Sequence, residues 1–247
     1  MTDTEGPLPE PRRIYAIGDI HGCDELLDRM IETITRDIEC PASLESIAPG
    51  ECLVVALGDY VDRGPGSRKV IERLARNPFP SSFVALKGNH EALLEEFLAE
   101  PETAGYWRQL GGLETLHSYG VDVANVMRGK FYDAAAEALE LAMPPAHRDF
   151  LASLRPSVSA GRYFLCHAGV RPGIPLDRQS DEDLLTIRGP FLHSRADFGK
   201  VVVHGHTPVE EPELRPNRIN IDTGAFMTGR LTCVVLEGQR VRCLTAF

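Results

Sequence analysis

Three times in the first part of the chain, a short apolar run ends in a glycine-bearing polar turn and is followed by a helical pattern. The apolar runs cover residues 14–17, 53–57 and 83–86, and the polar turns cover residues 18–22, 58–64 and 87–91. Short apolar runs that stop at such turns are typical of buried strands, and apolar residues three and four apart indicate helices. Strands that alternate with helices in this way predict an α/β fold with a largely parallel first half.

The second half of the chain returns to strands after a long helical stretch. Helical spacing from about residue 101 to about residue 156 predicts a helical insert, for which a lid role and a purely structural role are both open. Strands are expected at 162–166, 200–203 and 218–221, and a closing hairpin at 231–236 and 240–245. We therefore expect a single domain over residues 14–247, with two mixed sheets flanked by helices, preceded by a disordered leader over residues 1–13.

Charge and cysteine spacing argue against several classes of function. No run reaches the roughly 18 apolar residues that a membrane helix needs. A net charge of −10 disfavours nucleic acid and anionic membranes as partners. The six cysteines are scattered without a C-x-x-C pair, which argues against a zinc cluster or a disulfide framework and suits a reducing cytoplasm.

Residues that commonly bind metals stand at five junctions between a strand and a turn. The candidates are Asp19, His21, Asp59, Asn89, His167 and His206. Carboxylate, imidazole and amide donors without a thiolate suit Mn, Fe, Zn or similar ions. Asp19 and His21 are two residues apart, so an extended backbone would point both side chains the same way. Two ions roughly 3.5–4 Å apart, bridged by Asp59, would activate a hydroxide and clamp a phosphoryl group for in-line attack.

The three polar turns together resemble a known set of motifs. Residues 18–22, 58–64 and 88–91 are similar to the three signature motifs of the PPP-type phosphoprotein phosphatases, which belong to the calcineurin-like metallophosphoesterases. Residues 166–169, 187–188, 205–207 and 221–225 are similar to the compact bacterial and bacteriophage branch of these enzymes. The resemblance covers about residues 14–236 and implies a calcineurin-like sandwich of two mixed sheets.

The resemblance also implies a dinuclear metal site. One ion would be held by Asp19, His21 and Asp59, and a second by Asp59, Asn89, His167 and His206. We expect two divalent ions, Mn²⁺ first, with Fe, Zn and Ni as alternatives. The candidate ligands include no thiolate, which agrees with this choice of metal ions.

Four further residues have implied roles in the reaction. His90 would be the general acid that protonates the leaving oxygen, and Asp62 would orient it. Arg63 and Arg188 would grip the phosphate oxygens, for which planar guanidinium groups are well suited.

Some positions depart from the family pattern. Lys87 stands where Arg often precedes the third motif, and Thr186 stands where Trp often precedes the later arginine. The role of His204, two residues before the expected ligand His206, is left open.

The implied function is a protein serine/threonine phosphatase that acts on a phosphorylated protein or peptide. Asp62 and Glu91 resemble the protein-phosphatase versions of the motifs, whereas Cys23 and residues 63–67 also suit a symmetrical dinucleoside tetraphosphatase. A binding module without catalytic activity is disfavoured, because the set of ligands and the acid are complete. Neither the oligomeric state nor the physiological substrate follows from the sequence.

Overall fold

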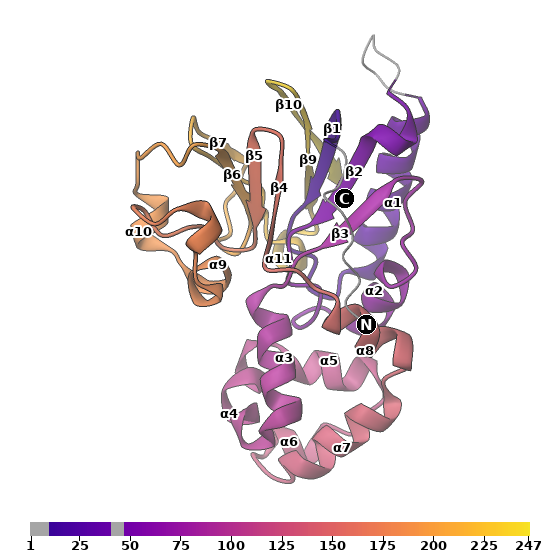
Figure 1. Cartoon of the computed structure of the whole chain (residues 1–247). Helices are drawn as coiled ribbons and strands as arrows, with labels where there is room; N and C mark the ends of the chain where they lie inside the picture. Colours follow the sequence, from indigo (N-terminus) through magenta and orange to yellow (C-terminus); the bar gives the residue numbers. More distant parts are fainter. Residues whose placement is uncertain (1–9, 41–46) are drawn as a thin grey trace, which may run out of the picture.

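Two facing sheets form one part of the molecule, and a group of helices lies below them (Figure 1). This computed structural model describes residues 10–40 and 47–247. The strands are β1 (Arg13–Ile17), β2 (Cys52–Ala56), β3 (Ser82–Ala85), β4 (Ser157–Ala160), β5 (Tyr163–Cys166), β6 (Val201–His204), β7 (Glu213–Leu214), β8 (Arg218–Asn220), β9 (Leu231–Glu237) and β10 (Arg240–Ala246). One five-stranded sheet has the order β10-β9-β1-β2-β3 and the other has the order β4-β5-β6-β8-β7.

Both sheets are mixed, as the sequence predicts. In the first, β1, β2 and β3 are parallel, and β9 and β10 are antiparallel additions. In the second, β5, β6 and β8 are parallel, and β4 and β7 are antiparallel edges. Parallel strands bring their carboxyl ends to one edge, which is where open α/β sheets bind ligands.

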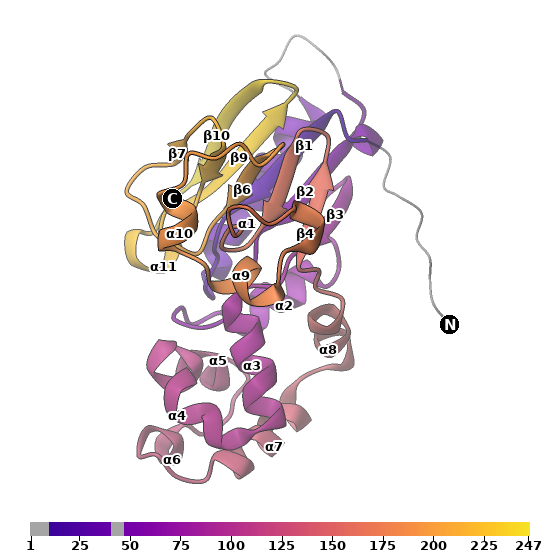
Figure 2. The ribbon, with the colours of Figure 1, turned by 60° about the vertical axis from the view of Figure 1, so that its left-hand side comes forward.

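The helices divide between the flanks of the sheets and the predicted insert. The longer helices are α1 (Asp24–Glu39), α2 (Ser67–Leu74), α3 (Asn89–Ala99), α7 (Tyr132–Ala142) and α8 (Pro145–Ala152). The shorter ones are α4 (Ala104–Trp107), α5 (Gly112–Ser118), α6 (Ala124–Met127), α9 (Asp181–Thr186), α10 (Gly189–Leu192) and α11 (Ala225–Thr228). Helices α3 to α8 form a group of their own below the sheets in both views (Figures 1 and 2). Within the described ranges, no helix has the length and apolar content needed to cross a membrane.

Side-chain alternation along β1 divides the core into layers. Tyr15 and Ile17 pack with apolar residues of α1 and α2, whereas Ile14 and Ala16 pack with Leu165 and its neighbours on the second sheet. A strand that is buried on both faces needs an almost continuous apolar run, which is the pattern found in the sequence.

The far face of the second sheet has its own small core. Phe164 and Val202 of the sheet pack with Ile187 and with Phe191 of α10. The order of layers is therefore helices, sheet, sheet and helices, from α9 and α10 on the left of Figure 1 to α1 on the right.

The structure differs from the sequence-based expectations in several places. β1 begins at Arg13 rather than at residue 14, and Arg13 is fully buried with an ion pair to Glu237 at 3.0 Å. The predicted leader therefore ends before Arg13, and its residues 1–9 lie outside the described part of the chain. Strands β4 and β7 and helices α9, α10 and α11 were not predicted, because they are short and lack a clear apolar period.

The turn after β1 rests directly on the turn after β2. The backbone N–H of Gly22 donates to the carbonyl of Tyr60 (2.9 Å), and the N–H of Gly64 donates to the carbonyl of His21 (3.0 Å). A Cβ atom on Gly22, where φ is +63°, would lie 2.4 Å from the carbonyl oxygen of Gly64. Close backbone contact of this kind requires glycine.

We predict that Gly22→Ala destabilises the protein more than Gly120→Ala. Both glycines have positive φ, but a Cβ at Gly120 would meet no atom within 4 Å. Left-handed backbone strain alone costs roughly 1–2 kcal/mol, and overpacking at Gly22 adds roughly 1–3 kcal/mol. Urea unfolding of both variants measures the difference. Equal losses of unfolding free energy would show that the contact between the turns is not tight.

Candidate active site

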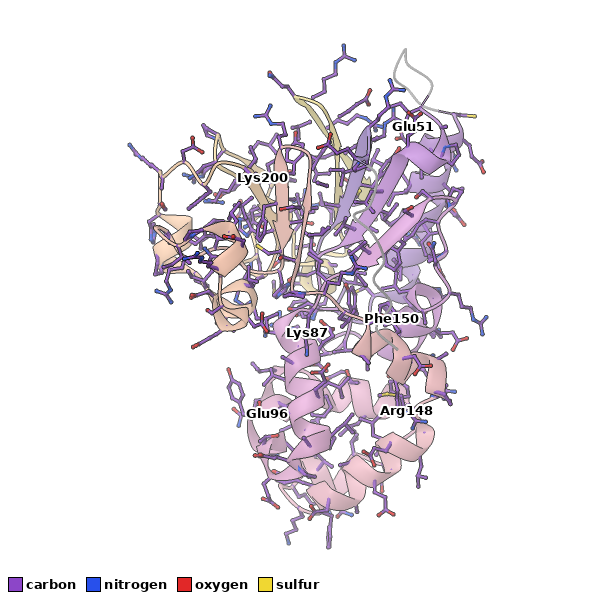
Figure 3. All side chains as sticks on the ribbon, in the orientation of Figure 1. Glu51, Lys87, Glu96, Arg148, Phe150 and Lys200 are labelled. Carbon is purple, nitrogen blue, oxygen red and sulfur yellow. The ribbon has the colours of Figure 1, made fainter. Side chains whose placement is uncertain are left out.

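The polar turns after β1, β2 and β3 lie where the sheets meet the insert. Figure 3 shows Lys87, from the turn between β3 and α3, at this junction. The six predicted metal ligands are linked by a chain of contacts in this region. All of them are buried except Asn89, which is half-buried. The residues predicted from strand ends far apart in sequence therefore form one site.

Several site residues adopt left-handed backbone conformations that non-glycine residues rarely take. Their φ angles are +46° at His21, +53° at Asp59, +72° at Asp62, +68° at Arg63 and +65° at His206. The expectation that an extended backbone aligns Asp19 with His21 is therefore wrong. Conformations of this kind persist only where surrounding contacts fix them, and they are frequent at functional sites.

The side chain of Glu91 fixes the second turn against the third. Its carboxylate accepts backbone N–H bonds from Asp59 (2.9 Å), Tyr60 (2.7 Å), Val61 (3.2 Å) and Gly88 (3.0 Å). The sequence placed Glu91 in the third motif but gave it no role. The available signal was its position in the first turn of a helix, where a glutamate commonly binds free backbone N–H groups.

The first donor group centres on His21 and Asp59. His21 Nε2 lies 3.4 Å from Asp59 Oδ2, and His21 Nδ1 lies 2.9 Å from the carbonyl oxygen of Val61. A carbonyl only accepts, so Nδ1 carries the hydrogen and Nε2 presents its lone pair to the site. Burial lowers the pKa of His21 to about 3. His21 is therefore a neutral imidazole, the form that binds metal ions.

The second donor group consists of His167, Asn89 and His206. His167 Nδ1 donates to the carbonyl of Leu57 (3.0 Å), so its Nε2 presents a lone pair. That Nε2 lies 3.0 Å from Asn89 Oδ1 and 3.4 Å from Asp59 Oδ1. His206 Nδ1 lies 2.9 Å from the same Asn89 oxygen. The lone pairs of His167 Nε2, Asn89 Oδ1 and Asp59 Oδ1 converge here, and a cation between them would satisfy all three.

Asp59 joins the two groups through its two oxygens. Oδ2 faces His21 and Oδ1 faces His167, and Oδ1 also accepts the backbone N–H of His90 (3.1 Å). Burial alone would raise the pKa of Asp59, but the three nearby imidazoles of His167, His90 and His21 hold it below its usual range. This side chain has the position expected of a carboxylate shared by two ions.

Asp19 is linked to the second donor group through the backbone of His206. Its Oδ2 accepts the backbone N–H of His206 at 3.0 Å. Burial, together with the nearby carboxylates of Asp222 and Asp59, raises the pKa of Asp19. Buried like charges are costly unless cations compensate them. The charges of the site therefore fit divalent ions.

The predicted acid group lies beside the first donor group. His90 Nδ1 lies 2.7 Å from Asp62 Oδ2, and His90 Nε2 lies 3.9 Å from Asp59 Oδ2. Burial lowers the pKa of His90, but the carboxylates of Asp59 and Asp62 outweigh burial and raise it overall. By distance alone, His90 could also complete a metal group with His21 and Asp59.

Each of the two predicted phosphate-binding arginines contacts a histidine of the site. Arg63 Nη2 is 3.2 Å from His90 Nε2, and Arg188 Nε donates to His206 Nε2 at 3.0 Å. An arginine only donates, so His206 Nε2 is an acceptor in this arrangement. For His206 to bind an ion through Nδ1, Arg188 must release Nε2, and the exposure of Arg188 leaves room for that movement.

Three contacts to predicted site residues come from side chains that the sequence analysis did not single out. Trp107 Nε1 donates to Asp62 Oδ2 (2.8 Å), and Thr115 Oγ1 donates to Asp62 Oδ1 (2.6 Å). The guanidinium of Arg63 lies 4.6 Å above the ring centroid of Phe226. Only tertiary packing brings these side chains together, although Trp107 is the single tryptophan of the chain.

A surface groove of about 420 Å³ opens beside Arg63. It is lined by Arg63, Arg108, Gln109, Leu110, Gly111, Glu114 and Phe226. Small-molecule pockets range from roughly 300 to 1,000 Å³. The groove is therefore large enough for part of a substrate next to His90.

Two residues whose roles were left open have structural partners. Lys87 forms an ion pair with Glu95 of α3. His204 is buried against Phe191, with ring centroids 4.9 Å apart, and its Nδ1 lies 3.1 Å from the carbonyl of Gly205. Burial lowers the pKa of His204 to about 3. His204 is thus an uncharged, buried side chain that packs in the core beside Phe191.

The calcineurin-like phosphoesterase family model matches residues 12–227. The chain belongs to this family. The chain is therefore an enzyme, a metallophosphoesterase whose donor groups imply divalent metal ions.

Relatives of this phosphoesterase carry names from two activity classes. Serine/threonine-protein phosphatase 2 of Salmonella typhimurium is 27% identical over 237 residues, which cover 90% of this chain and 91% of the relative. The asymmetrical bis(5'-nucleosyl)-tetraphosphatase PrpE of Bacillus thuringiensis is 27% identical over 240 residues, which cover 88% of each chain. Equal identity to both leaves the substrate class undecided.

Solved structures share the fold of this phosphoesterase. A candidate diadenosine tetraphosphatase aligns with a TM-score of 0.63 and 20% identity, covering 100% of this chain and 96% of the other. The cold-active protein-tyrosine phosphatase of a psychrophilic Shewanella aligns with a TM-score of 0.58 and 15% identity, covering 100% and 85%. These similarities support the predicted two-sheet architecture.

We predict that Glu91→Gln weakens both folding and metal binding. A carboxamide would turn an NH₂ group toward backbone N–H donors, and each unsatisfied buried donor costs roughly 1–3 kcal/mol. Urea unfolding and manganese stoichiometry measure the two effects. Glu95→Gln on the same helix is the matched control, because that side chain is 41% exposed. If both variants were equally stable and bound manganese equally well, Glu91 would not be what holds the turns together.

Proposed function

We propose that this phosphoesterase removes phosphate from phosphoserine and phosphothreonine side chains of proteins, with phosphotyrosine as a further substrate. The observation that carries the proposal is the Asp62–His90 pair beside the donors around Asp59. His90 Nδ1 is 2.7 Å from Asp62, and its Nε2 is directed toward the Asp59 side of the site. An alkoxide leaving from phosphoserine needs a proton, and a histidine held by a carboxylate can supply one.

The metal ligands of the proposal are the two donor groups that share Asp59. Asp19 and His21 would hold one ion with Asp59. Asn89, His167 and His206 would hold the other. When bound, two divalent ions supply charge compensation for the phosphoryl oxygens and activation of the attacking water. Mn²⁺ is our first choice, with Fe, Zn and Ni as alternatives, because the donors are imidazole, carboxylate and amide oxygen without thiolate.

The arginines would orient the phosphate between the metal ligands and the acid. Arg63 lies next to His90, and Arg188 lies next to His206, so the two guanidinium groups reach the phosphate from different directions. Planar guanidinium groups bind phosphate oxygens through paired N–H donors. Once Arg63 turns to the phosphate, Nε2 of His90 is free to carry the proton.

His90 would act as the acid rather than as a metal ligand. As the bond between phosphorus and the serine oxygen breaks, Nε2 gives its proton to that oxygen. Asp62 accepts the Nδ1–H bond and stabilises the charged imidazole. The nearby guanidinium of Arg63, 3.2 Å from Nε2, disfavours a metal cation at that nitrogen.

A dinucleoside tetraphosphatase is the second candidate. The relatives named for this activity are asymmetrical enzymes, whereas the sequence motifs suggested the symmetrical type. The groove beside Arg63 favours the candidate, because the ring of Phe226 offers a surface for a nucleobase. The resemblance of Asp62 and Glu91 to the protein-phosphatase versions of the motifs favours a phosphoprotein substrate instead.

The proposal also covers partners and location. The acidic chain favours a protein substrate over nucleic acid or a membrane surface. The cysteines in the described residues are free thiols, which supports a cytoplasmic enzyme.

A substrate panel separates the two candidate functions. The manganese-loaded enzyme is assayed against phosphoserine, phosphothreonine and phosphotyrosine peptides and against diadenosine tetraphosphate, and the metal is then varied. We expect the highest kcat/KM on phosphoserine or phosphothreonine peptides. A kcat/KM that is far higher on diadenosine tetraphosphate would replace the first proposal with the second.

We predict that His90→Asn keeps both metal ions but lowers kcat on phosphoserine peptides by roughly 10²–10⁴-fold. The loss should shrink on para-nitrophenyl phosphate, because an acidic phenol leaves without needing a proton. Steady-state kinetics and metal analysis test both points. His117→Asn is the control, since His117 is exposed on α5. Equal losses on alkyl and aryl phosphates, or loss of an ion, would argue that His90 is a ligand or a structural residue.

A further inference from the structure

The helical insert reaches the acid pair directly through two buried side chains. Trp107 ends α4, and its Nε1 donates to Asp62 Oδ2 at 2.8 Å. That same oxygen faces His90 Nδ1 at 2.7 Å. Thr115 of α5 donates its hydroxyl to the other oxygen, Oδ1, at 2.6 Å. The hydroxyl also accepts the backbone N–H of Asp62 at 2.9 Å.

These contacts leave Asp62 little freedom. Asp62 and Thr115 are fully buried, and Trp107 is 1% exposed. Oδ1 has Thr115 as a donor, and Oδ2 has both Trp107 and His90. A buried carboxylate with donors on both oxygens is held in one orientation, because any rotation would break a charge-assisted bond in a dry site.

The insert packs so that Trp107 and Thr115 keep these positions. The ring of Trp107 stacks on Phe97 of α3, with centroids 4.7 Å apart and planes at 28°. A Cβ on Gly112 would lie 2.4 Å from the Trp107 ring. The carbonyl of Gly111 accepts the backbone N–H of Arg63 at 3.2 Å. The insert therefore packs closely against the turn that carries both Asp62 and Arg63.

We propose that Trp107 and Thr115 are positioning residues for proton transfer. They fix the Asp62 carboxylate, and through it they fix the direction in which His90 presents Nε2 to the leaving oxygen. Residues 104–118 thus belong to the catalytic apparatus, as a fixed wall rather than a lid. This inference rests on the proposed role of His90 as the acid.

A purely structural role for the two residues predicts a different result. Loss of packing would lower stability and slow the reaction on every substrate alike. Loss of acid positioning would slow only those substrates whose leaving group needs a proton. The two roles are therefore separated by the leaving group.

The test compares variants that remove the hydrogen-bonding group of each residue and keep an apolar side chain in its place. Trp107→Phe removes the indole N–H and keeps an aromatic ring on Phe97, and Thr115→Val removes the hydroxyl. Thr115→Ser restores the hydroxyl. Tyr119→Phe is the matched control, since it removes a buried bond to His147 (2.9 Å) elsewhere in the insert. Each manganese-loaded enzyme is assayed on a phosphoserine peptide and on para-nitrophenyl phosphate, and its manganese content is measured.

We expect Trp107→Phe and Thr115→Val to lower kcat on the phosphoserine peptide by about tenfold or more. A loss of this size is expected when a hydrogen bond to a charged group is removed. On para-nitrophenyl phosphate, kcat should change much less. KM and manganese content should stay near wild type, Thr115→Ser should recover most of the activity, and Tyr119→Phe should behave as wild type. Equal losses on both substrates, or the same loss in Tyr119→Phe, would overturn the inference.

A double-mutant cycle adds an independent criterion. Because both residues act through Asp62, Trp107→Phe should have little further effect in an Asp62→Asn background. An undiminished effect there would contradict the inference. If His90→Asn itself fails to discriminate between the two substrates, the proposed acid is wrong. If His90→Asn discriminates and Trp107→Phe does not, only the positioning role fails.

Discussion

The carboxylate of Asp59 faces two groups of donors at once, with one oxygen 3.4 Å from His21 and the other 3.4 Å from His167. It is buried, and it lies in the field of two further carboxylates, Asp19 and Asp222. We propose that cations on both sides of Asp59 compensate this accumulation of negative charge. The left-handed turn that places Asp59 there depends in turn on Glu91, which accepts the backbone N–H groups of the turn. Charge balance and backbone conformation are thus linked at one residue.

The same turn also carries Asp62, the proposed partner of the acid His90, three residues further on. Its support is different, because Trp107 and Thr115 of the insert hold its two oxygens. The half of the turn proposed to bind the metal ions is therefore anchored by the third motif, and the half proposed to assist proton transfer is anchored by the insert. On this proposal, substitutions can disturb metal binding and leaving-group protonation one at a time, although the residues involved are close in sequence.

Much of the site could be predicted from the sequence, because the donor residues follow short apolar runs that are typical of buried strands. Strands that alternate with helices are expected to pair in parallel, and parallel strands bring their carboxyl ends to the same edge of the sheet. The orientation of His21 could not be predicted, because its left-handed backbone is set by contacts with the neighbouring turn. The short edge strand β7 has too few residues to show a period. Trp107 and Thr115 contact Asp62 across 45 and 53 residues of sequence, so no local pattern marks them.

The central claim is that two metal ions share Asp59. The most direct measurement is anomalous diffraction from crystals of the manganese-loaded enzyme at the manganese absorption edge. We predict two peaks roughly 3.5–4 Å apart, with Asp59 between them. One peak should lie beside His21 and the other beside Asn89 and His167. A single peak, or two peaks of which only one contacts Asp59, would contradict the account.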